Sequence, residues 1–231
     1  MLDIPSFKIR CSAIGEIMTS PRDKGDVLSA TAKKYCETWL KEQLFRRKKK
    51  FSNKYTQKGV IVEDYSIDSL AAQLGYGFLL KNEDSFENEY LTGTPDLLPP
   101  GSNEVIDIKS SWSWVTLPLF EEECPNKLYW WQLQGYMALT GRAKARLAYI
   151  LSDTPIHLIE REARRYCYDN GYDDLDSDIY DMFYADMTYG DVAPSLKLKT
   201  FSFEKDENAI NQIYDRVEAC RYYIKNLLTK L

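Results

Sequence analysis

The chain has 231 residues, of which 44% are hydrophobic and 28% charged, and its formal net charge is -5. This length and composition indicate an ordinary soluble protein with a proper hydrophobic core, made of one domain or of one domain with an insertion. We find no apolar run near 18 residues and no secretory leader, so membrane and secreted proteins are excluded and a cytoplasmic location is expected.

Hydrophobic periodicity and turn residues predict a chain of helices and strands. The expected helices cover residues 30–47, 59–74, 127–139 and 206–228, and the expected strands cover 76–81, 86–91, 105–109, 145–151 and 197–203. This order predicts an α/β (α+β) fold with a central mixed sheet flanked by helices. We expect a single domain over 1–231, with an acidic insertion or surface flap at about 155–195.

The first expected helix leads into a basic run. From residue 41 to residue 58 there are eight Lys or Arg and one Glu, a local charge of +7. Phosphate affinity follows a local patch more than the total charge, so the run is a candidate DNA-binding surface. Cations at a helix C-terminus are also favoured by the macrodipole, which would make the run a solvated helix end. Its consecutive members are Arg46, Arg47, Lys48, Lys49 and Lys50.

The second expected helix carries a carboxylate within its apolar stripe. Val60, Glu63, Ile67, Leu70 and Leu74 follow one another at spacings of three and four residues. Burying a carboxylate is costly unless a cation or hydrogen bonds satisfy it, so Glu63 is a candidate metal ligand. The alternative places Glu63 in the first turn of the helix, where the helix dipole favours an acid.

The strand over 105–109 carries the strongest chemical signal. Asp107 and Lys109 share one face of it because side chains alternate along a strand. Asp96 lies eleven residues before Asp107, directly after a proline. Two carboxylates hold a hard cation through oxygen, and a lysine can orient or help to activate a water. The three together predict a Mg²⁺-dependent phosphodiesterase, although Asp-x-Lys alone would fit a solvated edge strand.

Aromatic residues flank this signal. Trp112 and Trp114 follow the strand, and stacking of a base on such a side chain contributes about 1–3 kcal/mol. A core or subunit-contact role fits the two tryptophans equally well. On the next helix Tyr129, Gln132 and Tyr136 share one face. A buried amide must find partners, which for Gln132 are a metal-bound water, the lysine, a phosphate oxygen or the backbone of a strand.

The sequence motifs of other enzyme classes are not found. The one histidine, His157, stands between two apolar residues, which disfavours histidine-based nucleases and triads, and no Gly-rich phosphate loop is found. The cysteines are odd in number and contain no Cys-x-x-Cys pair, so reduced thiols are expected. They are Cys11, Cys36, Cys124, Cys167 and Cys220.

The ordered set of motifs resembles the PD-(D/E)XK nuclease superfamily, and more closely its phage lambda exonuclease and viral YqaJ-type recombinase branch. The resemblance covers roughly residues 8–151, and the last strand and helix also fit. It implies a restriction-endonuclease-like core. The motifs that carry it are Ser12, Gly59-Val-Ile-Val-Glu63, Pro95-Asp96, Asp107-Ile108-Lys109 and Gln132-Leu-Gln134.

The resemblance also implies roles for individual residues. The catalytic residues would be Glu63, Asp96, Asp107, Lys109 and Gln132. The ligands of Mg²⁺, for which Mn²⁺ is expected to substitute, would be Asp96, Asp107, the backbone carbonyl of Ile108 and Glu63. Ser12 and Arg10 would hold the 5′-phosphate of a DNA end, although the spacing of Arg10 from the serine departs from the family pattern.

The function implied is a DNA exonuclease of phage or prophage recombination type, in a bacterial or phage-infected cell. It would digest one strand of a linear duplex from its 5′ end, as a ring-shaped homo-oligomer, and leave an overhang for a single-strand annealing protein. Alternatives are a restriction-type or junction-resolving endonuclease and a RecB-like iron–sulfur nuclease, whose clustered cysteines are lacking. The alternative outside enzymes is an inactive DNA-binding module.

Overall fold

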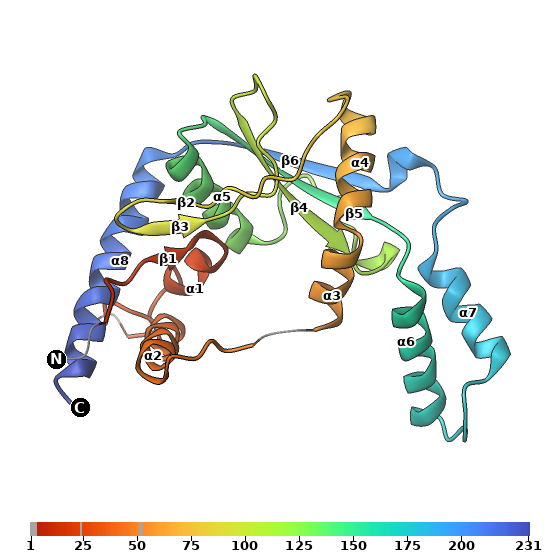
Figure 1. The fold of residues 1–231 in the computed structure, drawn as a ribbon, viewed down its shortest axis with the longest axis horizontal. Coiled ribbons are helices and arrows are strands. Elements are labelled where there is room, and N and C mark those ends of the chain that lie inside the picture. Colours follow the sequence, from red (N-terminus) through yellow and green to blue (C-terminus); the bar gives the residue numbers. More distant parts are fainter. Residues whose placement is uncertain (1–3, 24, 51–52) are drawn as a thin grey trace.

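The computed structural model describes residues 4–23, 25–50 and 53–231, which fold around a central three-stranded sheet (Figure 1). Its strands are β4 (Glu104–Ser111), β5 (Lys144–Leu151) and β6 (Leu198–Glu204), in the order β4-β5-β6. β4 and β5 are parallel, with Asp107 opposite Leu147, whereas β6 is antiparallel to β5. The expected mixed sheet is therefore confirmed.

Helices cover both faces of this sheet (Figure 1). The side of β5 that carries Leu147 faces α5 and α8, with α1 and α2 in the same core. The other side, which carries Ile150, packs against Ile67 and Leu70 of α4. The helices are α1 (Ile14–Ile17), α2 (Ala30–Phe45), α3 (Lys54–Ile61), α4 (Glu63–Leu74), α5 (Lys127–Thr140), α6 (Ile156–Asp169), α7 (Ser177–Met187) and α8 (Glu207–Leu228), with short 3₁₀ helices at Cys11–Ala13, Trp114–Thr116 and Pro194–Leu196.

A second, smaller sheet lies beside α1 and α5. It consists of β1 (Ile9–Arg10), β3 (Leu91–Gly93) and β2 (Phe86–Glu87), with β1 parallel and β2 antiparallel to β3. The prediction of one continuous strand over 86–91 is wrong, because the chain reverses at Asn88. The Asn88 side-chain oxygen accepts hydrogen bonds from the backbone N–H groups of the two residues that enter β3.

The helix expected over 59–74 is also corrected. It is divided at Val62, so that α3 ends at Ile61 and α4 begins at Glu63. Val60 belongs to α3 and is 74% exposed, so it is not part of a buried stripe with Ile67.

The strand expected over 76–81 is not found, and this segment is irregular. Gly75 closes α4 in the left-handed conformation, and Gly77 adopts a positive φ two residues later. Two such turns interrupt the extended backbone that a strand requires.

The acidic segment folds as a helical hairpin. α6 and α7 pack against each other and extend away from the end of the central sheet (Figure 1). Whether the hairpin is an insertion relative to other proteins stays a prediction. Among the described residues, no helix is both long and apolar enough to span a bilayer.

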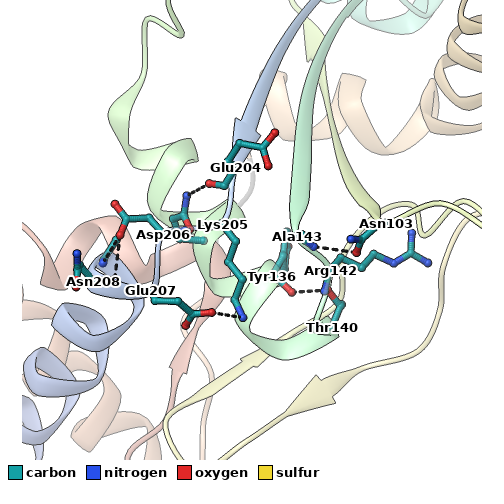
Figure 2. Close-up of polar contacts among 12 residues, drawn as sticks. Asn103, Tyr136, Thr140, Arg142, Ala143, Glu204, Lys205, Asp206, Glu207 and Asn208 are labelled. Atoms are coloured by element: carbon teal, nitrogen blue, oxygen red, sulfur yellow. Dashed lines mark hydrogen bonds and ion pairs between the residues drawn. The ribbon is translucent and has the colours of Figure 1, made fainter.

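Hydrogen bonds join the ends of the central elements (Figure 2). The Asp206 carboxylate caps α8 by accepting from the N–H groups of Asn208 and Ala209. The side chain of Gln134 on α5 donates to the carbonyl of Glu204 and accepts from the N–H of Asp206. The same glutamine thus fixes α5 against the junction of β6 and α8.

Candidate active site

The site begins at the free edge of β4. Leu97 forms an antiparallel bridge with Ile106, which draws the preceding Asp96 alongside the strand. One carboxylate oxygen of Asp96 accepts a hydrogen bond of 2.7 Å from the backbone N–H of Ile108. The N–H and C=O of one strand residue point to the same side, so the carbonyl of Ile108 faces the edge occupied by Asp96.

Asp107 and Lys109 lie on the face of β4 that is turned toward α5. The Lys109 ammonium is 2.7 Å from Asp107 Oδ2. Gln132 donates a hydrogen bond of 2.8 Å to Asp107 Oδ1 and accepts one of 3.4 Å from Lys109. The three side chains therefore close a ring of interactions, and the prediction that the acid and the lysine share a face is confirmed.

The aromatic face of α5 encloses this ring. Lys109 Nζ lies 4.6 Å from the centre of the Tyr129 ring, and the Tyr136 hydroxyl accepts a hydrogen bond from Gln132. Of the alternatives for Gln132, the structure supports the contact with the lysine. The bond to a strand backbone belongs instead to Gln134.

The negative charges of Asp96 and Asp107 repel each other. Burial raises the pKa of Asp96 to about 7, the negative charge of Asp107 adds to this effect, and the N–H of Ile108 opposes it. Burial disfavours the charge of Lys109, but the pKa of its ammonium is raised overall by Asp107 and Asp96. Such a pair of carboxylates is relieved by a positive ion.

The donors at the β4 edge fit Mg²⁺. This ion is commonly held by one or two carboxylates, with water and substrate phosphate completing its octahedron. Asp96 and Asp107 supply the carboxylates, and the Ile108 carbonyl supplies a further oxygen on the same edge. Asp107 Oδ2 is buried and contacts the Lys109 ammonium at 2.7 Å, so a cation bound at this oxygen would displace that ammonium.

Glu63 forms an ion pair with Lys81 in this structure, and its place among the metal ligands stays a prediction. It is the first residue of α4, as the alternative interpretation expected, and its carboxylate lies 2.6 Å from the Lys81 ammonium. Across the described ranges, no three His, Cys, Asp or Glu side chains gather as metal ligands. The sequence did not link Lys81 to Glu63, because the two lie 18 residues apart and Lys81 ends a segment that was expected to form a strand.

The N-terminal residues approach the site through Cys11. A Cβ added at Gly93 would lie 2.9 Å from both Cys11 Sγ and a ring carbon of Tyr136, so both side chains pack closely against Gly93. The neighbouring Arg10 and Ser12 are exposed. Ser12 makes no cap bond, since the residues at the cap positions of the first two helical turns are Arg10 and Ala13. Ser12 therefore does not serve as a helix cap.

The two tryptophans contact neighbouring elements. Trp112 packs edge-on against Tyr55 of α3, with the ammonium of Lys54 4.7 Å from the centre of its ring. Trp114 is 58% exposed and donates a hydrogen bond of 2.9 Å to Asp186 of α7. They join α3 and the acidic hairpin to the end of β4, and their role in DNA binding stays a prediction.

The basic run divides into two environments. The side chains from Arg46 to Lys50 are exposed and make no ion pair with any other described residue. They follow the end of α2, whose last turn contains no basic residue. Lys58 is fully buried, and its ammonium donates to the carbonyl of Trp112. Lys58 is therefore not part of an exposed patch.

Comparison with known proteins supports the family resemblance. No family model and no curated protein matches the chain. A phage-related exonuclease from Haemophilus somnus 129PT is 29% identical, with a TM-score of 0.80 over 98% of this chain and 97% of that chain. The alkaline exonuclease LHK-Exo from Laribacter hongkongensis is 16% identical, with a TM-score of 0.65 over 96% and 92% of the two chains, and has also been solved with dAMP. The resemblance to the viral recombinase branch of the PD-(D/E)XK superfamily is confirmed.

Proposed function

We propose that this chain is a Mg²⁺-dependent exonuclease that hydrolyses linear double-stranded DNA from its ends, in the 5′ to 3′ direction. The observation that carries the proposal is the ring of Asp107, Lys109 and Gln132 beside Asp96, on a fold shared with a phage-related exonuclease. The neighbour solved with dAMP holds a deoxynucleoside monophosphate, which is the product class of an exonuclease.

The residues of the ring have separate tasks. Lys109 orients the water that attacks phosphorus and offsets negative charge on the phosphate. The amide of Gln132 binds both Asp107 and Lys109 and fixes their relative positions. The Tyr129 ring covers the Lys109 ammonium. Mg²⁺ held by Asp96, Asp107 and the Ile108 carbonyl would lower the pKa of a bound water and stabilise charge on the phosphate oxygens.

Two further features are proposed by family analogy. A ring-shaped homo-oligomer would keep the enzyme on its substrate, since the sequence has no ATP-binding loop to drive movement. The remaining strand would be passed to a single-strand annealing protein.

The direct experiment is digestion of duplexes labelled at one end, in linear and circular form, with Mg²⁺. We expect the linear substrate to release labelled mononucleotides from the 5′ end while the circle stays intact. Cutting of the circle would instead support the endonuclease alternative. A wild-type protein that binds DNA but cleaves neither substrate would support the inactive module.

A further inference from the structure

A segment outside the predicted motifs is docked on the Pro95-Asp96 turn. The backbone N–H of Asn82 donates a hydrogen bond of 2.8 Å to the carbonyl of Asp96, and the Asn82 side chain donates one of 2.9 Å to the carbonyl of Pro95. A third bond, of 3.0 Å, joins the Asn82 amide to the carbonyl of Asp84. The residue next to Lys81 is thus fixed to the backbone of a candidate metal ligand.

This docking holds the Lys81 ammonium at the rim of the active site. Its 2.6 Å contact is with Glu63, the carboxylate that the family motif assigns to the metal, and Asp96 and Asp64 also act on its charge. The side chain is 45% exposed, so the ammonium can also reach solvent and anything bound there. Glu63, Asp96 and Asp107 with Lys81 and Lys109 have a formal charge of -1.

We propose that Lys81 is a second lysine of the active site, which holds Glu63 while no divalent cation is bound and contacts a backbone phosphate of the DNA once a cation competes for that carboxylate. An ammonium is a compact point charge on a flexible stem, which suits such an exchange of partners. The inference rests on the proposed metal-dependent nuclease function and adds a residue to it. An ordinary surface ion pair would influence neither metal nor DNA.

Calorimetry with Mn²⁺ in the absence of DNA tests whether Lys81 competes with the cation for Glu63. Lys81→Met should bind Mn²⁺ about two- to fivefold more tightly than the wild type, because a competing ammonium is removed. Lys81→Arg, which keeps the charge, should resemble the wild type. Lys144→Met is the matched control, because Lys144 pairs with Glu204 at the start of β5 at 3.4 Å. Equal affinity in Lys81→Met and the wild type would overturn the inference, whereas a wild type that binds no Mn²⁺ would overturn the proposed function itself.

The salt dependence of duplex binding tests whether Lys81 contacts a DNA phosphate once a cation is bound. In Ca²⁺, the slope of log affinity against log salt should be smaller by about 0.9 in Lys81→Met than in the wild type, because one phosphate fewer is neutralised. In EDTA the two proteins should have equal slopes, because Lys81 then remains on Glu63. Lys144→Met should match the wild type in both solutions. The same difference with and without Ca²⁺, or none in either, would overturn the exchange of partners.

Discussion

Two regions of this protein are expected to meet DNA, and they are built in opposite ways. On β4, Asp107 is 1% exposed and both of its oxygens are engaged, by Gln132 and by Lys109. In the basic run 46–50, only the backbone is held, because Glu42 accepts from the N–H of Lys49, while the side chains extend into solvent. The first region fixes atoms in space, whereas the second supplies charge without a fixed geometry.

The two regions can therefore contribute to the reaction in different ways. Preorganised groups in a dry site act strongly on a developing charge, and removal of one is costly. Exposed lysines act through counterion release, which is additive and independent of sequence. Substitutions in the two regions should therefore differ in size and in kind.

The largest effect is expected on the face of β4. Lys109→Ala and Asp107→Asn should each lower the cleavage rate by about 10²–10³ or more, because each removes a main electrostatic element of the site. Rates are measured on a linear duplex in Mg²⁺, and thermal unfolding checks that the fold is kept. Lys144→Met, which removes an exposed lysine of β5, should cleave normally. A near-wild-type rate for either active-site variant would show that the substituted residue does not act in cleavage.

The effect expected for Ser12 lies between those of the β4 site and the basic run, because Ser12 is exposed but follows the buried Cys11. If it holds a terminal phosphate, 5′-phosphorylated ends should be digested faster than 5′-hydroxyl ends, and Ser12→Ala should erase most of the difference. A hydrogen bond to a charged group contributes about 1.5–3 kcal/mol, or roughly tenfold or more in rate. Ser12→Thr, which keeps a hydroxyl, is the control. Equal wild-type rates on both ends would contradict the phosphate role.

A graded effect is expected for the basic run. Changing Lys48, Lys49 and Lys50 to Gln should weaken binding to all duplex sequences alike and lower the salt slope by about 0.9 for each phosphate that is no longer neutralised. The matched control changes the same three residues to Arg and keeps the charge. Anisotropy titrations at several salt concentrations give both slopes. If the Gln variant keeps the wild-type slope, the run is a solvated segment after α2.

The smallest effect concerns Lys58, which belongs to the same run in sequence but is buried. Burial lowers the pKa of its ammonium to about 8 from the ordinary 10.5, and the nearby Asp153 opposes the shift. The unfolded chain therefore binds more protons between these values, and the Lys58 contribution to stability rises with pH through that window, by about 1 kcal/mol from pH 7.5 to 9.

The measurement is the free energy of unfolding of the wild type and of Lys58→Met at several pH values. Cys11, whose thiol pKa is raised by burial, makes an opposite contribution in the same range. The difference between the two proteins cancels that contribution. We expect this difference to shift in favour of the wild type as the pH rises. A difference that does not change with pH would show that Lys58 is as solvated as its neighbours.

Much of the site could be predicted because it depends on local periodicity. Alternation along a strand places Asp107 and Lys109 on one face whatever surrounds them. The helical repeat places Gln132 between Tyr129 and Tyr136 in the same way. The apolar residues of α8 from Ile210 to Ile224 recur at helical spacing and are buried for the same reason.

The predictions failed where a helix or strand is interrupted within a few residues, or where a side chain pairs with a residue far away in the sequence. The 3- and 4-residue spacing of Val60, Glu63 and Ile67 is correct, but the helix is interrupted at Val62, so the spacing does not describe one face. The strand predicted at 86–91 contains Asn88. Its side chain accepts two backbone hydrogen bonds, and these stabilise a turn in place of a continuous strand.

Local patterns in the chain are enough to show which residues are capable of the chemistry and which of them share a face, because backbone dihedral angles repeat over a few residues. The pairing of charges is seen only in the folded protein. Folding placed Glu63 against Lys81, buried Lys58 beneath Trp112 and left Arg46 to Lys50 in solvent. Pairing depends on groups far apart in the chain and on the water that folding excludes between them, and neither leaves a periodic trace in the sequence.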